Sequence, residues 1–331
     1  MPEPVYPALR VQNLLSEEAG HIALRLLEGE AGLEREVRTH KIQKPGLVLA
    51  GYRSYLRANR IQVFGGSEMQ YLRDITPEKR REVLEPVFVP DVPAIVVTKD
   101  VDPTEEVRYH AREHALPLFA TPHSSSVLVF RLTTYLEEKL APCITLHGVM
   151  IEVFGVGILI LGESGIGKSE CALNLVSRGH RLVGDDAVNI KRRESGVLIA
   201  EGKDLVRQNI ELRGLGIVNV RDLFGFTAVK RRKEVDLIVN LESWKDETDY
   251  ERLGVEHEHT ELMGLSVPLI RVPVMPGRNL AALIEVAARN HILIRQGRHP
   301  AREVERKVLH AIKGKAADAA ENAPGLKREK R

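Results

Sequence analysis

The most informative segment of this chain is Gly162-Glu163-Ser164-Gly165-Ile166-Gly167-Lys168-Ser169. It follows the apolar run 157–161, and the residues after it place apolar side chains at helical spacing as far as Gly179. Two glycines separated by four residues, followed by Lys-Ser and set between a strand and a helix, are typical of a phosphate-binding loop. Backbone N–H groups of such a loop surround phosphates, and the next helix points its positive N-terminus at them. The sequence therefore predicts that the chain binds a nucleoside triphosphate.

Two side chains of this loop have predicted roles of their own. We expect Lys168 to reach the β- and γ-phosphates and Ser169 to ligate Mg²⁺. The other residues of 162–169 are expected to hold the nucleotide mainly through their backbone.

The composition is that of an ordinary globular protein. The chain has 331 residues, of which 43% are hydrophobic, so it is long enough for two domains with real cores. Its 48 basic and 46 acidic residues give a net charge of +2, which provides no overall field for nucleic acid or an anionic membrane. The basic runs 191–193 and 230–233 lack interleaved aromatic residues and are interpreted as solvated turns or hairpin ends. We expect neither a nucleic-acid nor a membrane partner.

The cysteines and the N-terminus indicate the compartment. Cys143 and Cys171 both lie in apolar surroundings and are expected to be buried thiols rather than a disulfide. Residues 1–7 lack a basic region followed by an apolar core, and no apolar segment approaches the length of a membrane span. A cytoplasmic protein is expected.

Residues 1–140 are expected to form an α/β domain with a mainly parallel sheet. Residues 92–98 and 116–121 read as buried strands, and each precedes a helical pattern. The first of these helices is expected to start at Asp102, with Pro103 in its first turn, and the second to run from serines 124–126 to about Leu140. Helices are also expected over about 16–27 and from Thr76 onward, and the glycine loop 64–67 is interpreted as an ordinary turn. This half carries no catalytic constellation, so a regulatory or assembly role is expected for it.

Ala141-Pro142 marks the predicted boundary to a catalytic domain over 141–314. Short β-branched runs alternate with glycine turns from Cys143 to about Val239, interrupted by the helix after the phosphate loop. Helical periodicity within 280–314 predicts two terminal helices. The small, charged and aperiodic tail 315–331 is predicted to be disordered.

Paired acids are expected beside the phosphate loop. Asp185-Asp186 follows the strand-like run 181–184, and adjacent side chains on an extended backbone point to opposite sides. One carboxylate can then approach Mg²⁺ while the other faces the attacking nucleophile, and their repulsion should raise the proton affinity of one of them. A turn with solvated acids is the alternative.

Other candidates carry less information on their own. Alternation of side chains over 209–219 places Glu211 and Arg213 on one face of a strand. The two are either a metal-binding carboxylate beside a phosphate-binding guanidinium or an ordinary ion pair on an edge strand. His147 is either a structural strand histidine or a site residue. Arg252 and Arg278 lie in polar, loop-like contexts where either could clamp a transferring phosphoryl group.

Together, four segments resemble the bacterial HPr kinase/phosphorylase family: His147-Gly148-Val149, 162–170, 178–188 and 210–219. The resemblance implies an enzyme of carbon catabolite control. It would phosphorylate a serine of HPr, the small phosphocarrier of the sugar phosphotransferase system, using ATP or pyrophosphate. It would also remove that phosphate by attack of inorganic phosphate, giving pyrophosphate.

The resemblance also implies residue roles. His147, Lys168, Asp186 and Arg252 would be active-site residues, and Ser169 and Glu211 metal ligands. The segments 210–219 and 273–278 would be regions tied to catalysis, the second especially to dephosphorylation. The kinase domain would resemble phosphoenolpyruvate carboxykinases in fold and would assemble into homohexamers. We hypothesise Asp186 as the general base, tuned by His147.

Two alternatives remain open at this point. One is a small-molecule kinase or a phosphoenolpyruvate-carboxykinase-like enzyme that uses the same loop. The other is a nucleotide-dependent switch that hydrolyses ATP slowly; the chain has no Asn-Lys-x-Asp motif, which weakens a guanine-nucleotide version of it.

Overall fold

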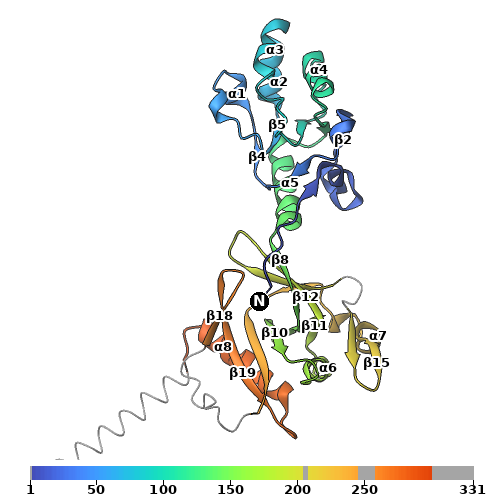
Figure 1. The fold of residues 1–331 in the computed structure, drawn as a ribbon, viewed down its shortest axis with the longest axis vertical. Helices are drawn as coiled ribbons and strands as arrows, with labels where there is room; N and C mark the ends of the chain where they lie inside the picture. The colour runs from blue at the N-terminus through green and yellow to red at the C-terminus, as the bar shows by residue number, and fades with distance from the viewer. Residues whose placement is uncertain (1, 204–207, 245–257, 300–331) are drawn as a thin grey trace, which may run out of the picture. The chain divides into compact units, whose positions relative to one another are not determined.

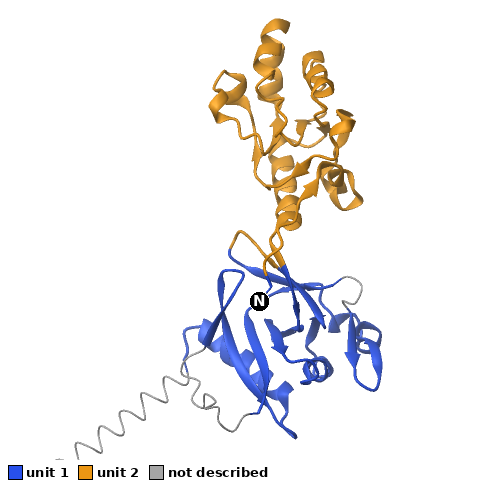
Figure 2. Ribbon diagram, in the orientation of Figure 1, with its two compact units in different colours: residues 1–2, 144–190, 196–331 blue, residues 3–143, 191–195 orange. Residues whose placement is uncertain are grey.

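A computed structural model of the chain describes residues 2–203, 208–244 and 258–299 (Figure 1). The chain divides into two compact units (Figure 2). The N-terminal unit, unit 2 in the figure, consists of residues 3–143 together with 191–195. The C-terminal unit, unit 1, consists mainly of residues 144–190 and the chain from Gly196 onward.

The N-terminal unit is built on a five-stranded sheet with the order β2-β7-β6-β5-β4. The four strands from β4 to β7 run parallel, and β2 joins β7 antiparallel at one edge, which confirms the mainly parallel α/β class. The parallel strands β5, β6 and β7 are buried along their whole length, as expected for a sheet covered on both faces. The strand bounds are β2 Arg25–Glu28, β4 Ile42–Gln43, β5 Ile61–Phe64, β6 Ile95–Thr98 and β7 Leu118–Thr121.

Helices cover both faces of this sheet. On one face, apolar residues of α2, α3 and α4 pack on Phe64 and Val97; on the other, α5 packs on Val63 and Phe119. The helix bounds are α1 Gly46–Leu49, α2 Gly66–Asp74, α3 Pro77–Leu84, α4 Glu105–Glu113 and α5 Ser125–Leu140. The short strands β1 (Leu9–Arg10) and β3 (Glu36–Val37) pair separately.

Two expectations for this unit are wrong. Residues 16–27 do not form a helix: a 3-10 helix covers Glu17–Ile22, Ala23 takes a left-handed conformation with φ 55°, and β2 follows. Residues 25–28 form a strand instead of a helix because pairing with β7 completes the edge of the sheet. Leu24 and Leu26 then pack in the core. Helix α4 begins two residues later than expected, with Thr104 rather than Asp102 as its N-cap residue.

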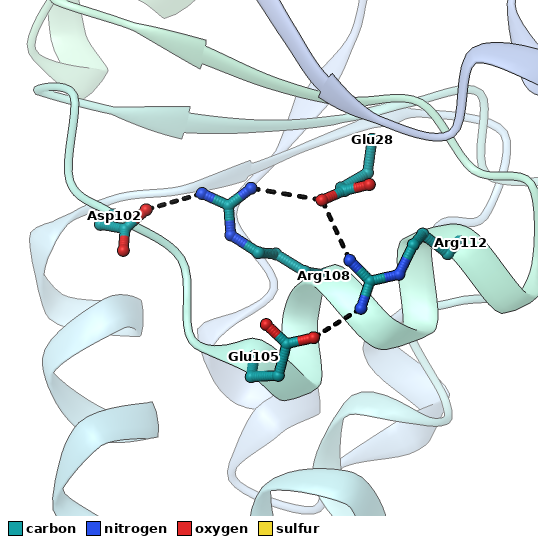
Figure 3. Close-up of polar contacts among 5 residues, drawn as sticks. All are labelled: Glu28, Asp102, Glu105, Arg108 and Arg112. Atoms are coloured by element: carbon teal, nitrogen blue, oxygen red, sulfur yellow. Dashed lines mark hydrogen bonds and ion pairs between the residues drawn. The ribbon is translucent and has the colours of Figure 1, made fainter.

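A chain of ion pairs joins β2 to α4 (Figure 3). The Arg108 guanidinium donates to Asp102 at 2.6 Å and to Glu28 at 3.3 Å. Arg112 donates to the same Glu28 carboxylate at 3.1 Å and also pairs with Glu105. Glu28 therefore links the edge strand to the helix, and Asp102 pairs with one of the two arginines that make this link.

The C-terminal unit contains a six-stranded sheet with the order β11-β9-β10-β17-β19-β18. Strands β10, β17 and β19 run parallel, whereas β9, β11 and β18 each pair antiparallel with a neighbour. The strand bounds are β9 Val149–Val153, β10 Val156–Gly162, β11 Arg181–Gly184, β17 Leu237–Ser243, β18 Glu258–Leu262 and β19 Leu265–Val274.

Helices cover one face of this sheet and a second sheet covers the other. Helices α6 (Lys168–Ser177) and α8 (Leu280–Arg295) pack on Ile158 and Ile160, while Met150 and Leu159 face a four-stranded sheet on the opposite side. That sheet has the order β16-β13-β12-β8, with bounds β8 Cys143–His147, β12 Ala187–Arg192, β13 Leu198–Gly202 and β16 Arg232–Glu234. A hairpin of β14 (Asn209–Leu212) and β15 (Gly216–Asn219) leads into α7 (Val220–Phe224).

The predicted helix near 280 is therefore present as α8, while the second terminal helix and the tail 315–331 lie outside the described residues. Within those residues, both cysteines are free; Cys171 is buried as expected, but Cys143 is only partly buried. No helix in the described part of the chain is long and apolar enough to span a bilayer.

Candidate active site

The phosphate loop connects β10 to α6 in a conformation that only glycine adopts easily. Gly162 has φ 145° and Gly165 has φ 80°. A Cβ atom on Gly162 would lie 2.5 Å from the Leu241 carbonyl oxygen, and one on Gly165 would lie 2.5 Å from a guanidinium nitrogen of Arg213. The turn therefore requires both glycines, and the Leu241 backbone additionally excludes a side chain at Gly162.

Lys168 begins α6 and lies back over the loop. Its side chain is buried, and Nζ donates hydrogen bonds to the carbonyl oxygens of Gly162 at 2.9 Å and Glu163 at 2.8 Å. An ammonium group at the N-terminus of a helix adds its charge to the positive end of the helix dipole. The loop and the helix thus present concentrated positive potential to an incoming phosphate.

A cavity of about 140 Å³ opens at this end of α6. It is lined by His147, Ser164, Gly165, Gly167, Lys168, Ser169, Glu170, Asp185, Asp186, Glu211 and Arg213. Most of the residues singled out in the sequence therefore meet at one place. Of the loop residues, Gly162 and Glu163 contribute carbonyls that hold Lys168, and Ile166 packs against the core.

The two adjacent acids have different surroundings. Asp185 is buried; its carboxylate accepts a hydrogen bond from Ser169 Oγ at 3.0 Å and one from the Glu211 N–H at 3.3 Å. Burial raises the pKa of the Asp185 carboxyl, and these hydrogen bonds oppose the rise. The neighbouring Asp186 charge contributes least, so the expected rise in proton affinity occurs mainly through desolvation and not through repulsion.

Asp186 faces a different partner. Its side chain is 62% exposed, and Oδ1 lies 2.9 Å from His147 Nδ1. Its backbone is left-handed, with φ 65°, and its carbonyl accepts the Gly148 N–H at 3.1 Å. This backbone hydrogen bond from the bend between β8 and β9 therefore helps to hold the carboxylate beside the histidine and in reach of solvent or an acceptor.

The β14–β15 hairpin closes the cavity from the side of the loop. Glu211 is exposed at the end of β14, and the Arg213 guanidinium packs against Gly165. Ile210 and Leu212 point the other way and join the core formed with α6. The alternation read from the sequence therefore places a carboxylate and a guanidinium over the phosphate loop.

The oxygen donors of the cavity fit a Mg²⁺ ion. Ser169 Oγ and the carboxylates of Asp185 and Glu211 are hard oxygen ligands of the kind Mg²⁺ prefers. Asp185 is only 3% exposed, and a cation would offset the penalty that burial imposes on its charge. A site beside a phosphate loop usually shares the metal between protein oxygens and substrate phosphates.

One predicted residue lies elsewhere, and another is not described. Arg278 follows β19, outside the cavity lining, and donates to the Pro273 carbonyl at 3.2 Å. Arg252 lies outside the described residues. Conversely, Glu170 lines the cavity, although no pattern in the sequence assigns it a role beyond that of an acid in the first turn of the helix after the loop.

Comparisons with known proteins identify the family. Residues 9–136 match the family model described as HPr Serine kinase N terminus, and residues 138–308 match the HPr Serine kinase C-terminal domain. The HPr kinase/phosphorylase of Geobacter sulfurreducens is 41% identical over 302 residues, covering 91% of this chain and 95% of that protein. That of Brevibacillus brevis is 43% identical over 298 residues, covering 90% and 96%.

A solved structure is also similar. The Hpr(Ser) kinase/phosphatase from Coxiella burnetii is 37% identical, with a TM-score of 0.44, covering 46% of this chain and 93% of that one. The family models span most of the sequence, and the resemblance drawn from the motifs is confirmed. The chain belongs to the HPr kinase/phosphorylase family.

Proposed function

We propose that this protein phosphorylates a serine of HPr with ATP or pyrophosphate, and that it also removes the phosphate by attack of inorganic phosphate, giving pyrophosphate. The observation that carries the proposal is the single cavity that brings the phosphate loop together with the Asp186–His147 pair. One side of that cavity suits a phosphoryl donor. The other side offers a base to a hydroxyl acceptor.

The donor side positions and neutralises charge, which is most of what phosphoryl transfer requires. Lys168 would exchange its carbonyl partners for phosphate oxygens, and loop N–H groups would surround them. Arg213 lies against Gly165, where its guanidinium can meet an anionic group. Ser169, Asp185 and Glu211 would hold Mg²⁺, which when bound neutralises phosphate charge.

The acceptor side supplies the proton transfer. As the serine oxygen forms its bond to phosphorus and the donor's bridging P–O bond breaks, Asp186 accepts the hydroxyl proton. In the reverse direction, protonated Asp186 returns that proton to the departing serine oxygen. His147 Nδ1, at 2.9 Å from Oδ1, orients the carboxylate. One carboxylate thus serves both directions.

Further assignments complete the proposal. Arg252 and Arg278 would contact transferring or attacking phosphate, with the 273–278 segment serving phosphorolysis. Residues 141–314 would form the catalytic domain, related in fold to phosphoenolpyruvate carboxykinases, and residues 1–140 would serve regulation or assembly. A homohexamer acting in the cytoplasm on carbon catabolite control is the expected setting.

The test is to incubate the purified protein with HPr, Mg²⁺ and γ-labelled ATP, and then to add excess inorganic phosphate. Label should appear on HPr and then in pyrophosphate. Label on a small metabolite without HPr would instead indicate a small-molecule kinase. Nucleotide binding with no transfer to HPr would refute the proposed reaction.

A further inference from the structure

The β14–β15 hairpin exposes apolar side chains beside the cavity. In the antiparallel pairing, Glu211 lies directly opposite Ile217. Opposed residues of such a pair project from the same face of the sheet, with neighbouring Cβ atoms. Ile217 therefore lies next to the cavity-lining carboxylate, yet it is 71% exposed. Leu215, two residues beyond cavity-lining Arg213, is 78% exposed.

Folding of the hairpin does not require these two side chains. Its inner face already buries Ile210 and Leu212 in the core shared with α6, and Val218 packs against the same core. Leu215 and Ile217 add apolar surface on the outer side, where a polar residue would serve the hairpin equally well. Adjacent exposed apolar residues of this size mark interaction sites more often than scattered single ones do.

The elements that follow the hairpin in the chain also expose apolar side chains. Leu223 on α7 is 65% exposed, and Phe226, in the 3-10 turn after α7, is 74% exposed with Arg221 over its ring at 5.5 Å. Figure 1 shows α7 and β15 together at one side of the C-terminal unit. We call Leu215, Ile217, Leu223 and Phe226 the hairpin patch.

We propose that the hairpin patch is the docking surface for the protein substrate, with Leu215 and Ile217 contacting the chain around its acceptor serine. This inference rests on the proposed function. The serine must reach a cavity of about 140 Å³, whereas a specific protein interface buries about 800 Å² per partner. Most of the contact must therefore lie outside the cavity, and the hairpin that carries Glu211 and Arg213 is directly continuous with it.

The chemistry of the patch favours a protein over a small acceptor. A metabolite held within the cavity would leave Leu215 and Ile217 uncovered, because both project beside the cavity and do not line it. A protein seated over the cavity would cover both and remove water from the reacting groups. Apolar contacts of this kind act mainly on affinity for the acceptor and not on the chemical step.

The test uses the full-length protein with Ile217→Ser and, separately, Leu215→Ser. The matched control is Phe130→Ser, because Phe130 is 73% exposed but lies on α5 in the N-terminal unit. Each hairpin variant should raise KM for HPr about tenfold, with kcat and ATP affinity unchanged. Ile217→Met, which keeps an apolar side chain of similar volume, should stay close to the parent.

Three results would overturn the inference. Unchanged KM in both serine variants would remove the patch from substrate binding. Loss of oligomers by light scattering with unchanged KM would identify it as an interface between copies of this chain. A fall in kcat alone would indicate a disturbed cavity. If the parent protein itself fails to phosphorylate HPr, the proposed function fails first, and that failure is visible without any variant.

Discussion

At Asp186 the backbone adopts a left-handed conformation that aspartate tolerates better than most residues. This local turn separates two neighbouring carboxylates by environment: Asp185 is buried against Ser169, and Asp186 is exposed beside His147. An extended backbone with alternating side chains predicts the separation but not the turn. The turn is accompanied by a hydrogen bond from the Gly148 N–H to the Asp186 carbonyl, and Gly148 lies in the bend between β8 and β9, distant in sequence.

Replacing Asp186 tests its role as the shared proton acceptor. Asp186→Asn keeps the side-chain volume and a residue suited to left-handed φ, so the fold should persist. Both kinase and phosphorolysis rates should fall by about 10²–10⁴-fold, because general-base catalysis contributes that much. Rates come from labelled HPr and pyrophosphate, and ATP affinity from calorimetric titration, with exposed Asp91→Asn as control. Normal turnover in Asp186→Asn would rule the assignment out.

Replacing Arg278 should slow phosphorolysis more than it slows the kinase reaction. If its guanidinium binds attacking phosphate, Arg278→Ala should lower the rate of phosphorolysis about tenfold or more while kinase activity changes little. Arg278→Lys keeps a charge without the planar fork and should show an intermediate loss. Saturation curves in inorganic phosphate and in ATP measure the two directions. Equal losses would argue against a phosphate-specific role.

The spacing of residues in the sequence predicted most of the side chains that line the cavity, because a phosphate loop is a local structure. Lys168 and Ser169 follow from the loop itself, and Glu211 and Arg213 follow from strand alternation. Glu170 was missed because an acid in the first turn of a helix is common for electrostatic reasons alone. No local pattern could show that Arg278 lies outside the cavity lining, since its position depends on where β19 ends.

At the scale of elements, α8 is held to the end of α6 by a compact polar cluster. Glu285 on α8 accepts hydrogen bonds from Arg178 Nε at 3.0 Å and contacts His180 Nε2 at 2.9 Å. Phe154 lies edge-on to the His180 ring at 4.8 Å, and Arg289 stacks over Phe154 at 3.9 Å. The hydrogen bond from Arg178 is the main cause that lowers the pKa of Glu285 to about 2.

This shift predicts a pH dependence of stability. A carboxyl whose pKa is lower in the folded state stabilises the fold above its unfolded pKa, and that contribution disappears as it is protonated. For Glu285 the loss should occur as the pH falls from about 4.5 to about 2. Glu285→Gln should be less stable than the parent near neutral pH, and the difference should vanish near pH 2.

Urea unfolding at a series of pH values measures this difference. Glu3→Gln, at an exposed glutamate near the N-terminus, is the matched control and should not produce it. A difference between Glu285→Gln and the parent that stays constant from pH 7 to about 2 would contradict the role of the ionised carboxylate.

Elements with strong internal signals were predicted well, and elements decided by distant partners were not. Helix α8 has apolar residues at helical spacing, and α5 begins after the serine cap expected for it. Residues 16–27 carry a helix-like pattern, but Gly20 weakens it and the antiparallel place beside β7 decides the outcome. Such a long-range pairing cannot be read from a window of neighbouring residues.

At the scale of the whole molecule, the two units have separate hydrophobic cores. We therefore expect two transitions in calorimetric unfolding of the full chain. Mg²⁺ with ATP at 100 times Kd should raise the free energy of unfolding of the C-terminal unit by about 2.7 kcal/mol and leave that of the N-terminal unit unchanged. Lys168→Ala should abolish that shift. A single transition that moves as a whole would show that the units unfold together.

The turn 191–195 has a consequence for how this protein can be recombined. It connects β12 to β13, which both lie mainly in the C-terminal unit, yet the turn itself belongs to the N-terminal unit. There, Glu194 lies 3.2 Å from His40, and Arg193 pairs with Glu138 at 3.7 Å. The N-terminal unit is thus encoded in two separate segments. A chimera that exchanges residues 1–143 between relatives as one cassette would break these pairs, so we expect productive exchanges to carry the turn as well.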